Sequence, residues 1–277
     1  MNTKQIIVLV IVVALMGALL ARPIKGLVTE NKATTASAAS EASSAFNFQS
    51  VSEMTKQAIN AGLAQEITAL ETKAAEASGD EKIALLEQLA KKWDDLAKYA
   101  PQGFIYEEMA KISPKFEYWL KAGDAFRSAY TNLQDTAMAT ELNRLAIQSY
   151  ENAAELDGNN LDAKTGLGAA MVTGTNNPMA GIALLREVVA KDPKNIQANK
   201  TLGLFSLQSR QFDKAIERFK TVVELKPDAE SFFYLATGYE NIGLKNEAIA
   251  AFQKSKELAA DPSLSQFIDR RVEELSK

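Results

Sequence analysis

"TLGLFSLQSRQFDKAIERF" (Thr201 to Phe219) and "YLATGYENIGLKNEAIAAF" (Tyr234 to Phe252) are the same pattern, written 33 residues apart. Most letters differ, but certain slots are kept: Leu202-Gly203, Ala215-Ile216 and Phe219 in the first stretch, and Leu235-Ala236, Ala248-Ile249 and Phe252 in the second. Small residues in these slots let two helices cross closely, while the large residues fill the space beside the crossing. The stretch therefore predicts a repeated helical hairpin.

Earlier parts of the chain carry the same pattern. A third copy has Leu167-Gly168, Gly181-Ile182, Leu185 and Asp192-Pro193, with one extra residue at the turn "TGTNNP". A fourth copy shows its second helix through Ala146-Ile147, Tyr150, Ala153 and Leu156-Asp157. Its first helix would carry Trp119, Gly123 and Phe126, but an insertion around "TNLQDTAMATE" separates the two helices. The repeat thus extends backwards with growing departures from the pattern.

This unit resembles the tetratricopeptide repeat, in which about 34 residues form a helix, a tight turn and a second helix ended by Pro. The resemblance is specific over 161–262, weaker over 113–160, and only that of a general helical hairpin over 51–101. It implies an all-α fold, a right-handed α-solenoid of hairpins. Because a repeat cannot bury its apolar face alone, we expect a capping helix at 263–277. Asp261 is its predicted N-cap and Pro262 its first residue, with an apolar stripe of Leu264, Phe267, Ile268, Val272 and Leu275.

The resemblance also implies a binding surface. In this family the first helix of each unit lines a concave groove, and the second, fifth, ninth, twelfth and thirteenth positions contact the partner. In this chain these positions are Asp162, Thr165, Ala169, Val172 and Thr173; Gln197, Lys200, Leu204, Leu207 and Gln208; and Glu230, Phe233, Thr237, Glu240 and Asn241. The alternative is that each is simply solvated or half-buried surface. The set of Lys, Arg and Asn that clamps a terminal carboxylate in some family members is missing.

The region 51–112 is also helical in period. Ile59, Leu63, Ile67, Leu70 and Ala74 form one apolar stripe, and Leu86, Leu89, Trp93, Leu96 and Ala100 form a second before Pro101. They predict two helices in an antiparallel hairpin; a parallel coiled coil is the alternative, weakened by the break at Ser78-Gly79-Asp80. A further helix is predicted in "SPKFEYWLKAGDAFRSAY", with Phe116, Trp119, Leu120 and Gly123 on one face.

The N-terminus carries an apolar run, Ile6 to Ala21, without a polar residue. As a helix it would span about 24 Å, somewhat short of the roughly 30 Å hydrocarbon core. An uncleaved anchor, a cleaved signal peptide and a buried core helix are the alternatives, and the anchor is favoured because Leu19 would occupy the −3 position of a cleavage site. We therefore expect 1–28 to be a transmembrane anchor, 29–50 a flexible Ala/Ser/Thr-rich linker, 51–112 a helical hairpin region, 113–262 the repeats and 263–277 the cap.

The orientation of the anchor has two interpretations. Arg22, Lys25 and Lys32 follow the run and only Lys4 precedes it, which by the positive-inside rule favours a cytoplasmic C-terminal part. The layout of a short basic start, one apolar run and a long polar chain resembles instead a bacterial signal-anchor. We follow the second interpretation and expect a single-pass protein of the bacterial inner membrane, held there through residues 6–21, with its repeats facing the periplasm.

The amino-acid composition excludes several kinds of catalytic and metal-binding site. The chain of 277 residues has no Cys and no His, which excludes thiolate nucleophiles, disulfides, Cys/His zinc sites and imidazole bases. Its net charge is −4 and its basic residues are dispersed, which is not the footprint of a nucleic-acid-binding protein. "GLGAAM" (Gly166 to Met171) lacks the strand and third glycine of a dinucleotide site, and Asp94-Asp95 lies on a solvated helix face. We expect no enzyme activity and no cofactor.

Two functions remain open. The first is a non-catalytic, membrane-tethered scaffold that binds a protein or peptide partner in its concave groove. The second is a periplasmic assembly chaperone resembling the tetratricopeptide part of cytochrome c maturation or cell-envelope division factors. A maturation role predicts capture of a partner's C-terminal helix, whereas a scaffold predicts a stable complex.

Overall fold

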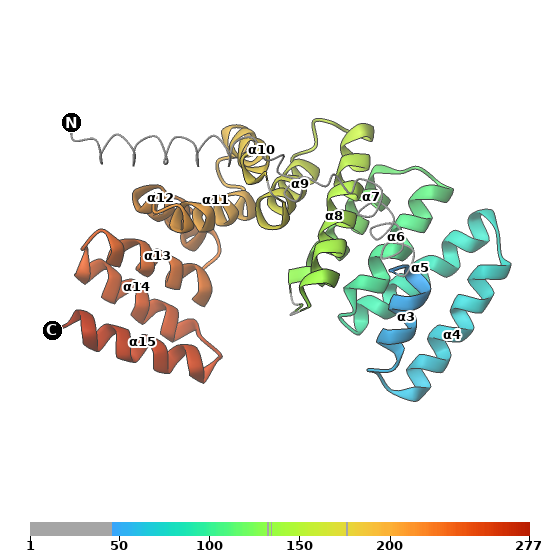
Figure 1. The fold of residues 1–277 in the computed structure, drawn as a ribbon, viewed down its shortest axis with the longest axis horizontal. Helices are drawn as coiled ribbons and strands as arrows, with labels where there is room; N and C mark the ends of the chain where they lie inside the picture. Colours follow the sequence, from blue (N-terminus) through green and yellow to red (C-terminus); the bar gives the residue numbers. More distant parts are fainter. Residues whose placement is uncertain (1–45, 132, 134, 176) are drawn as a thin grey trace, which may run out of the picture. The chain divides into compact units, whose positions relative to one another are not determined.

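The computed structural model describes residues 46–131, 133, 135–175 and 177–277, and within them all regular structure is helical. Asn47–Lys277 form one compact unit, which is described by itself. Thirteen helices are assigned in the described residues (Figure 1): α3 Phe48–Lys56, α4 Ala61–Glu76, α5 Gly79–Asp95, α6 Tyr99–Ile112, α7 Phe116–Thr131, α8 Thr136–Leu156, α9 Leu161–Gly174, α10 Pro178–Lys191, α11 Ile196–Gln208, α12 Phe212–Leu225, α13 Ala229–Asn241, α14 Lys245–Leu258 and α15 Pro262–Leu275. The predicted all-α helical repeat fold is confirmed.

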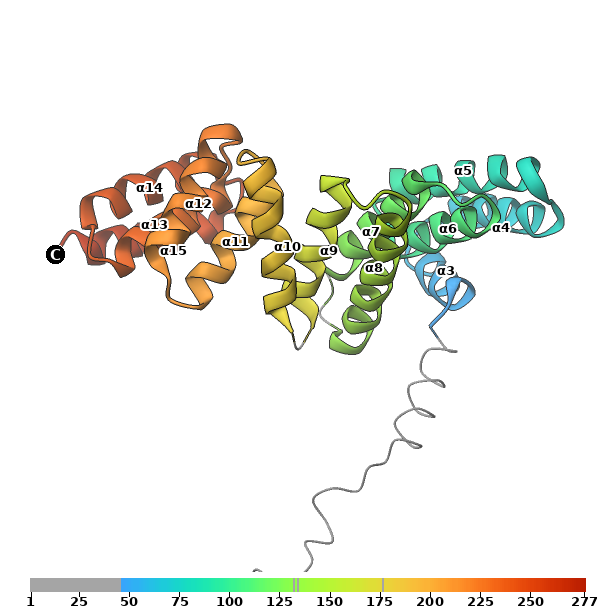
Figure 2. The same ribbon diagram turned by 90° about the horizontal axis from the view of Figure 1, so that it is seen from above.

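From α4 to α15, helices that are neighbours in the chain pack against one another, whereas α3 packs against α6 (Figure 1, Figure 2). The most extensive pairings include α7 with α8, α9 with α10, α11 with α12 and α13 with α14. The first helices of successive hairpins are also in contact: α7 with α9, α9 with α11, and α11 with α13. Stacking of hairpins through their first helices is what places side chains of several repeats on one shared surface.

Asn or Asp side chains mark the start of the first helix of each C-terminal hairpin and of the cap. Asn160, Asn195, Asp228 and Asp261 each accept a hydrogen bond from a backbone N–H in the first turn of α9, α11, α13 and α15, respectively. Such caps satisfy N–H groups that have no partner within the helix. The predicted N-cap at Asp261, with Pro262 as the first helical residue, is confirmed.

Small residues allow the two helices of a hairpin to approach closely. A β-carbon added to Gly203 of α11 would lie 2.8 Å from the Phe219 ring of α12, and one added to Gly181 of α10 would lie 2.5 Å from the Gly168 carbonyl oxygen of α9. Ala248 on α14 is fully buried. The small residues that recur along the chain therefore lie where the two helices of a hairpin cross.

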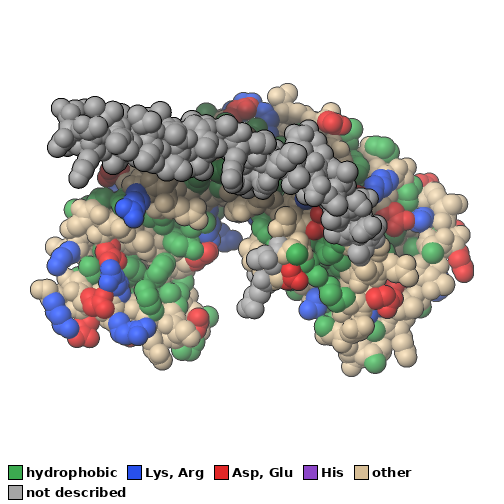
Figure 3. Space-filling view, in the orientation of Figure 1, with side chains coloured by type: hydrophobic (Ala, Val, Ile, Leu, Met, Phe, Trp, Pro, Cys, Tyr) green, Lys and Arg blue, Asp and Glu red, His purple; other side chains and the backbone are tan. Residues whose placement is uncertain are grey.

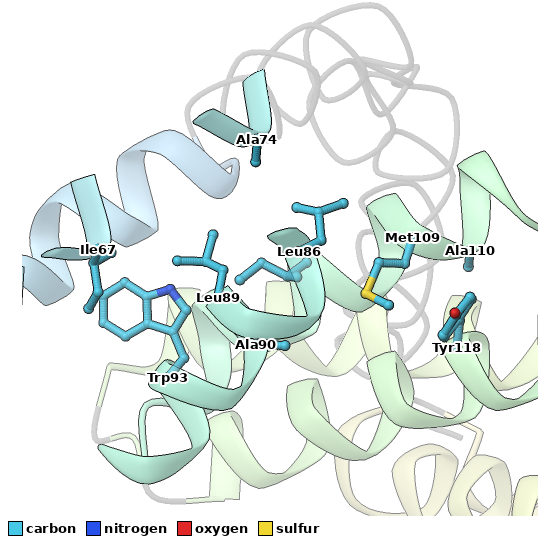
Figure 4. Close-up of a cluster of buried hydrophobic side chains, with 10 residues drawn as sticks. Ile67, Ala74, Leu86, Leu89, Ala90, Trp93, Met109, Ala110 and Tyr118 are labelled. Carbon is cyan, nitrogen blue, oxygen red and sulfur yellow. The ribbon is translucent and has the colours of Figure 1, made fainter. Parts of the chain in front are cut away.

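Clusters of buried apolar side chains stabilise successive parts of the unit, and three of them lie within the described residues as follows. The first joins α4 to α7 around Trp93, which Figure 4 shows beside Ile67 of α4. The second joins α10 and α11 around Leu185. The third joins α12 to α15 around Phe219 and includes Ile268 of the cap. Fully burying such side chains contributes roughly 1.5–3 kcal/mol each, which makes these clusters the main source of stability.

The region 51–112 differs from the single hairpin predicted from its apolar stripes. It is divided among four helices, α3 to α6, and Ile59 lies in the turn after α3. α3 begins at Phe48, inside the segment expected as linker, with a capping box between Asn47 and Ser50. Pro101 does not end a helix but lies in the first turn of α6, where a missing N–H costs nothing.

The expected localisation is contradicted by the helices of the described ranges. None of the helices in residues 46–131, 135–175 and 177–277 is long and apolar enough to cross a membrane. This conflicts with a single-pass membrane protein whose repeats face the periplasm. The apolar run at 6–21, the anchor expected over 1–28 and most of the linker expected over 29–50 lie outside the described residues.

Candidate partner-binding groove

The first helices of three successive hairpins, α7, α9 and α11, enclose a hollow of about 500 Å³. Six of its lining residues are among those that the repeat resemblance implies for partner contact: Ala169, Val172, Thr173, Gln197, Leu204 and Gln208. The others include Arg127 and Tyr130 of α7 and Phe205 of α11. The stacking of hairpins thus brings residues of three helices, from Arg127 to Gln208 in the chain, onto one surface.

A second hollow of about 240 Å³ adjoins the first and shares Arg127 and Gln197 with it. Two more of the implied residues, Asp162 and Thr165, lie in its lining, together with Asp124 of α7. Thr165 is buried, and its hydroxyl donates to the Leu161 carbonyl at 2.6 Å, so it shapes the hollow rather than offering a free hydroxyl. We call the two hollows together the α7–α9–α11 groove.

Arg127 is held in place by the buried Tyr150 of α8. Its Nε donates a hydrogen bond of 3.2 Å to the Tyr150 hydroxyl, which in turn donates to Asp124 Oδ1 at 2.7 Å. Burial, and then the Asp124 charge, raise the pKa of Tyr150 well above its usual value, which keeps the hydroxyl protonated. Burial also raises the pKa of Asp124, although Tyr150 and Arg127 act in the opposite direction. The three side chains form one polar cluster beside the groove.

The rest of the larger hollow offers neutral hydrogen-bonding groups. Tyr130 and Thr173 share a hydrogen bond of 2.8 Å between their hydroxyls, and Gln197 Nε2 donates to Thr201 Oγ1 at 3.2 Å. Leu204 and Phe205 supply apolar surface. Arg127 is the one charged residue among the residues that line this hollow. On the face of the molecule that Figure 3 shows, charged side chains of both signs are interspersed.

The implied positions on α13 lie outside the groove and are engaged within the chain. Phe233 is half-buried, with its ring centroid 5.6 Å from that of Phe252 and 5.8 Å from that of Phe267 on α15. Glu240 pairs with Arg271 of α15. Thr237 and Asn241 bond to carbonyls of their own helix, at 2.9 and 2.8 Å. Partner contact through these residues stays a prediction.

The remaining implied residues, Lys200, Leu207 and Glu230, are also engaged within the chain. Lys200 of α11 forms an ion pair of 2.6 Å with Glu230 of α13, and Asp228 lies 3.8 Å from the same ammonium group. Leu207 is half-buried and packs against the apolar cluster of α12 to α15. The single Lys of the implied groove is therefore neutralised by its own chain.

Sequence reasoning missed the contribution of α7. The repeat pattern predicts this contribution once Gly123 is aligned with Gly168. In that alignment Phe116, the first residue of α7, corresponds to Leu161, the first residue of α9. Counting from Phe116 puts Leu120, Asp124 and Arg127 at the fifth, ninth and twelfth positions. All three line the groove. The insertion before α8 hid this register.

The groove contains no evident metal site. Among the residues that the structure describes, no three Asp or Glu side chains converge as ligands for an ion. The chain also has no Cys or His to supply the usual ligands of transition metals.

These features define the class of the molecule: stacked helical hairpins whose first helices line a shared groove make a tetratricopeptide-type repeat fold. No family model and no curated protein sequence matches the chain. Solved structures do match. TTC0263, a thermophilic TPR protein of Thermus thermophilus, is 17% identical with a TM-score of 0.50, covering 68% of this chain and 97% of that one. MamA (41-end) of Desulfovibrio magneticus RS-1 is 22% identical with a TM-score of 0.50, covering 66% and 97%. At these identities the similarity concerns the fold alone.

Proposed function

We propose that this chain is a non-catalytic interaction protein that holds an extended segment of a protein partner in the α7–α9–α11 groove. The observation that carries the proposal is the hollow of about 500 Å³ lined by the first helices of three successive hairpins. Eight of the residues implied by the repeat resemblance line the groove, six in this hollow and Asp162 and Thr165 in the adjoining one. A scaffold role follows if the partner stays bound.

The chemistry of the lining suits an extended chain better than a compact ligand. Gln197 and Gln208 present side-chain amides at the two ends of α11, and such groups complement the N–H and C=O groups of a backbone. Leu204 and Phe205 offer apolar surface for side chains of the bound segment. Binding of this kind needs no catalytic group, in keeping with a chain that lacks Cys and His.

Site-specific photocrosslinking tests the proposal. A benzophenone amino acid replaces Gln208, which is exposed and lines the hollow, or Glu224 on the exposed side of α12 as the control. Crosslinked partners are identified in cells that express the full chain. The proposal expects a partner at Gln208 that is absent at Glu224 and is lost in Thr173→Trp, which fills the hollow from an exposed position.

The melting temperature separates a blocked groove from a misfolded protein. Thr173→Trp should leave it nearly unchanged, because exposed helix substitutions usually alter stability by no more than about 0.5 kcal/mol. Identical partners at Gln208 and Glu224, or a Gln208 partner that persists in folded Thr173→Trp, would overturn the proposal.

A further inference from the structure

The two hollows of the groove differ in charge. The larger one has Arg127 as its one charged lining residue, whereas the smaller one adds Asp124 and Asp162. Arg127 and Gln197 line both, so the positive and negative ends lie next to each other. A ligand that follows the groove across this junction meets a cation and then carboxylates. The ligand should therefore carry a negative charge beside Arg127 and a positive charge beside the carboxylates.

Most other charges near the implied groove are already neutralised. Lys200 pairs with Glu230, Glu240 with Arg271, and Lys164 with Glu187. In contrast, within the described ranges neither Arg127 nor Asp162 forms an ion pair with a residue of the chain. Asp124 also lacks an ion pair within these ranges, but its Oδ1 already accepts from Tyr150. This leaves Arg127 and Asp162 as the two charges that a ligand can pair with most directly.

Arg127 is prepared for a carboxylate. A guanidinium carries five N–H donors, and Tyr150 takes one from Nε at 3.2 Å, which fixes the side chain while the terminal nitrogens remain for a ligand. Asp124 lies nearby, but its Oδ1 accepts from Tyr150. A planar guanidinium held in this way favours a two-point hydrogen bond to a carboxylate. Asp162 is exposed at the start of α9, where a flexible cationic side chain can reach it.

We propose that the groove selects an extended protein segment that carries an acidic side chain and a nearby basic one. The acidic side chain binds Arg127 and the basic one binds Asp162. Gln197, between the two hollows, hydrogen-bonds the stretch that joins them. This inference rests on the proposed function, because it names the charge pattern of the segment that the groove holds.

Peptide pools of defined charge test this pattern with the full chain. Short peptides with blocked ends are made in a neutral background of Ala, Leu, Gln and Thr, with one Glu and one Lys at varied spacing and order, with Glu only, with Lys only, or with neither. Binding is followed by fluorescence anisotropy. We expect the dipolar pool to bind about tenfold more tightly than the pools with a single charge, a difference that corresponds to about 1.4 kcal/mol.

Variants assign each charge to its partner. Arg127→Gln should remove the advantage given by Glu, and Asp162→Asn should remove the advantage given by Lys, while Arg127→Lys keeps part of the first. Lys121→Gln is the matched control, because Lys121 is exposed on α7 and lies over the Tyr106 ring, away from both hollows. Melting curves establish that each variant is folded. Tyr150→Phe tests whether the Tyr150 hydroxyl positions Arg127. We expect it to reduce the affinity for peptides with Glu less than Arg127→Gln does.

The outcomes separate the inference from the function on which it rests. If all four pools bind alike and Thr173→Trp abolishes binding, the groove holds peptides but the charge pattern is refuted. If no pool binds, both the groove function and the charge pattern fail. A dipolar preference that survives in folded Arg127→Gln and Asp162→Asn also overturns the inference. Binding of free glutamate and lysine with no binding of peptides would make the site one for small molecules and refute the proposed segment.

Discussion

Gly166 of α9 lies so close to Tyr150 of α8 that a β-carbon added at Gly166 would be 2.3 Å from Cε1 and Cζ of the Tyr150 ring. Gly123 of α7 approaches the same ring, and a β-carbon there would lie 2.7 Å from Cε1. Tyr150 is thereby enclosed between two first helices of the groove, and its hydroxyl reaches Asp124 and Arg127. The two glycines set the position of the polar cluster on which the groove depends.

Gly166→Ala should therefore destabilise the protein. Overpacking a filled site costs about 1–3 kcal/mol, and each kcal/mol lowers the melting temperature of a domain of this size by roughly 2–4 °C. Gly158→Ala is the control, because a β-carbon there would meet only the Ala154 carbonyl oxygen, at 3.3 Å. Thermal unfolding followed by circular dichroism compares the two. Equal melting temperatures for both variants would show that the α8–α9 contact is looser than described.

Lys56 is a buried cation whose loss should be costly. It is 8% exposed and its ammonium group lies 2.7 Å from Glu53 and 2.8 Å from Glu71, which ties α3 to α4. Lys56→Met leaves the half-buried Glu71 without this cation, and we expect a loss of about 1–3 kcal/mol. Lys92→Met removes an exposed pair with Glu66 and should cost no more than about 1 kcal/mol. Chemical denaturation measures both; a smaller loss for Lys56→Met would contradict the expectation.

The same lysine predicts a dependence on pH. Burial lowers the pKa of Lys56, but Glu53 and Glu71 outweigh it and raise the pKa above the ordinary 10.5. The folded state then holds the proton more tightly than the unfolded state. The stabilisation is complete below pH 10.5 and is lost as the pH rises through the folded pKa. The difference in free energy of unfolding between the wild type and Lys56→Met should decrease as the pH rises above 10.5. An increase in this difference would refute the raised pKa of Lys56.

Phe233 should contribute to stability, because its ring lies among those of Phe252 and Phe267 and so joins α13 to the cap. Phe233→Ala is expected to cost about 2 kcal/mol, less than the roughly 3–5 kcal/mol of a fully buried Phe. Thr237→Ala, one turn further along the same helix, loses a bond to its own helix only and serves as the control. Unfolding curves give the difference. An unchanged stability in Phe233→Ala, with weaker partner binding, would instead support the partner contact implied by the repeat resemblance.

Removing the cap, residues 263–277, should make the protein self-associate and melt at a lower temperature. Ile268 is buried in the last apolar cluster, and Leu264, Val272 and Leu275 pack against it, so the deletion uncovers a contiguous apolar surface. Removal of Ser276 and Lys277 alone, which follow α15, is the matched control. Light scattering after size-exclusion chromatography reports the mass. A truncated protein that stays monomeric with an unchanged melting temperature would show that the cap is dispensable.

A fragment starting at Asn47 should fold as a cooperative helical protein, since residues 47–277 form a compact unit and Asn47 caps α3. A fragment starting at Gln57 lacks α3, including Val51, which is 2% exposed, and Lys56. We expect the second fragment to melt at a lower temperature than the first, and circular dichroism measures this. Equal melting temperatures would show that α3 contributes nothing to the unit.

The sequence alone determined the repeat over 161–262, because small residues at helix crossings and large ones beside them recur with a period that packing imposes. Gly203 against Phe219 and the buried Ala248 confirm those slots. The cap start at Asp261 and Pro262 was equally readable, since helix capping is a local interaction between neighbouring residues.

Tertiary structure alone decided which of the implied residues line the groove, and how the N-terminal region divides into helices. Arg127 reaches Tyr150 across 23 residues, and Phe233 is covered by Phe267 of α15, a contact that the expectation of a cap did not specify. Over 51–112 the apolar stripes continue while the chain turns at Ala97, a non-glycine residue at a φ of 52°, which no local pattern announces. Periodicity reports which face of a helix is buried, but the partner of that face is selected by packing between segments far apart in the chain.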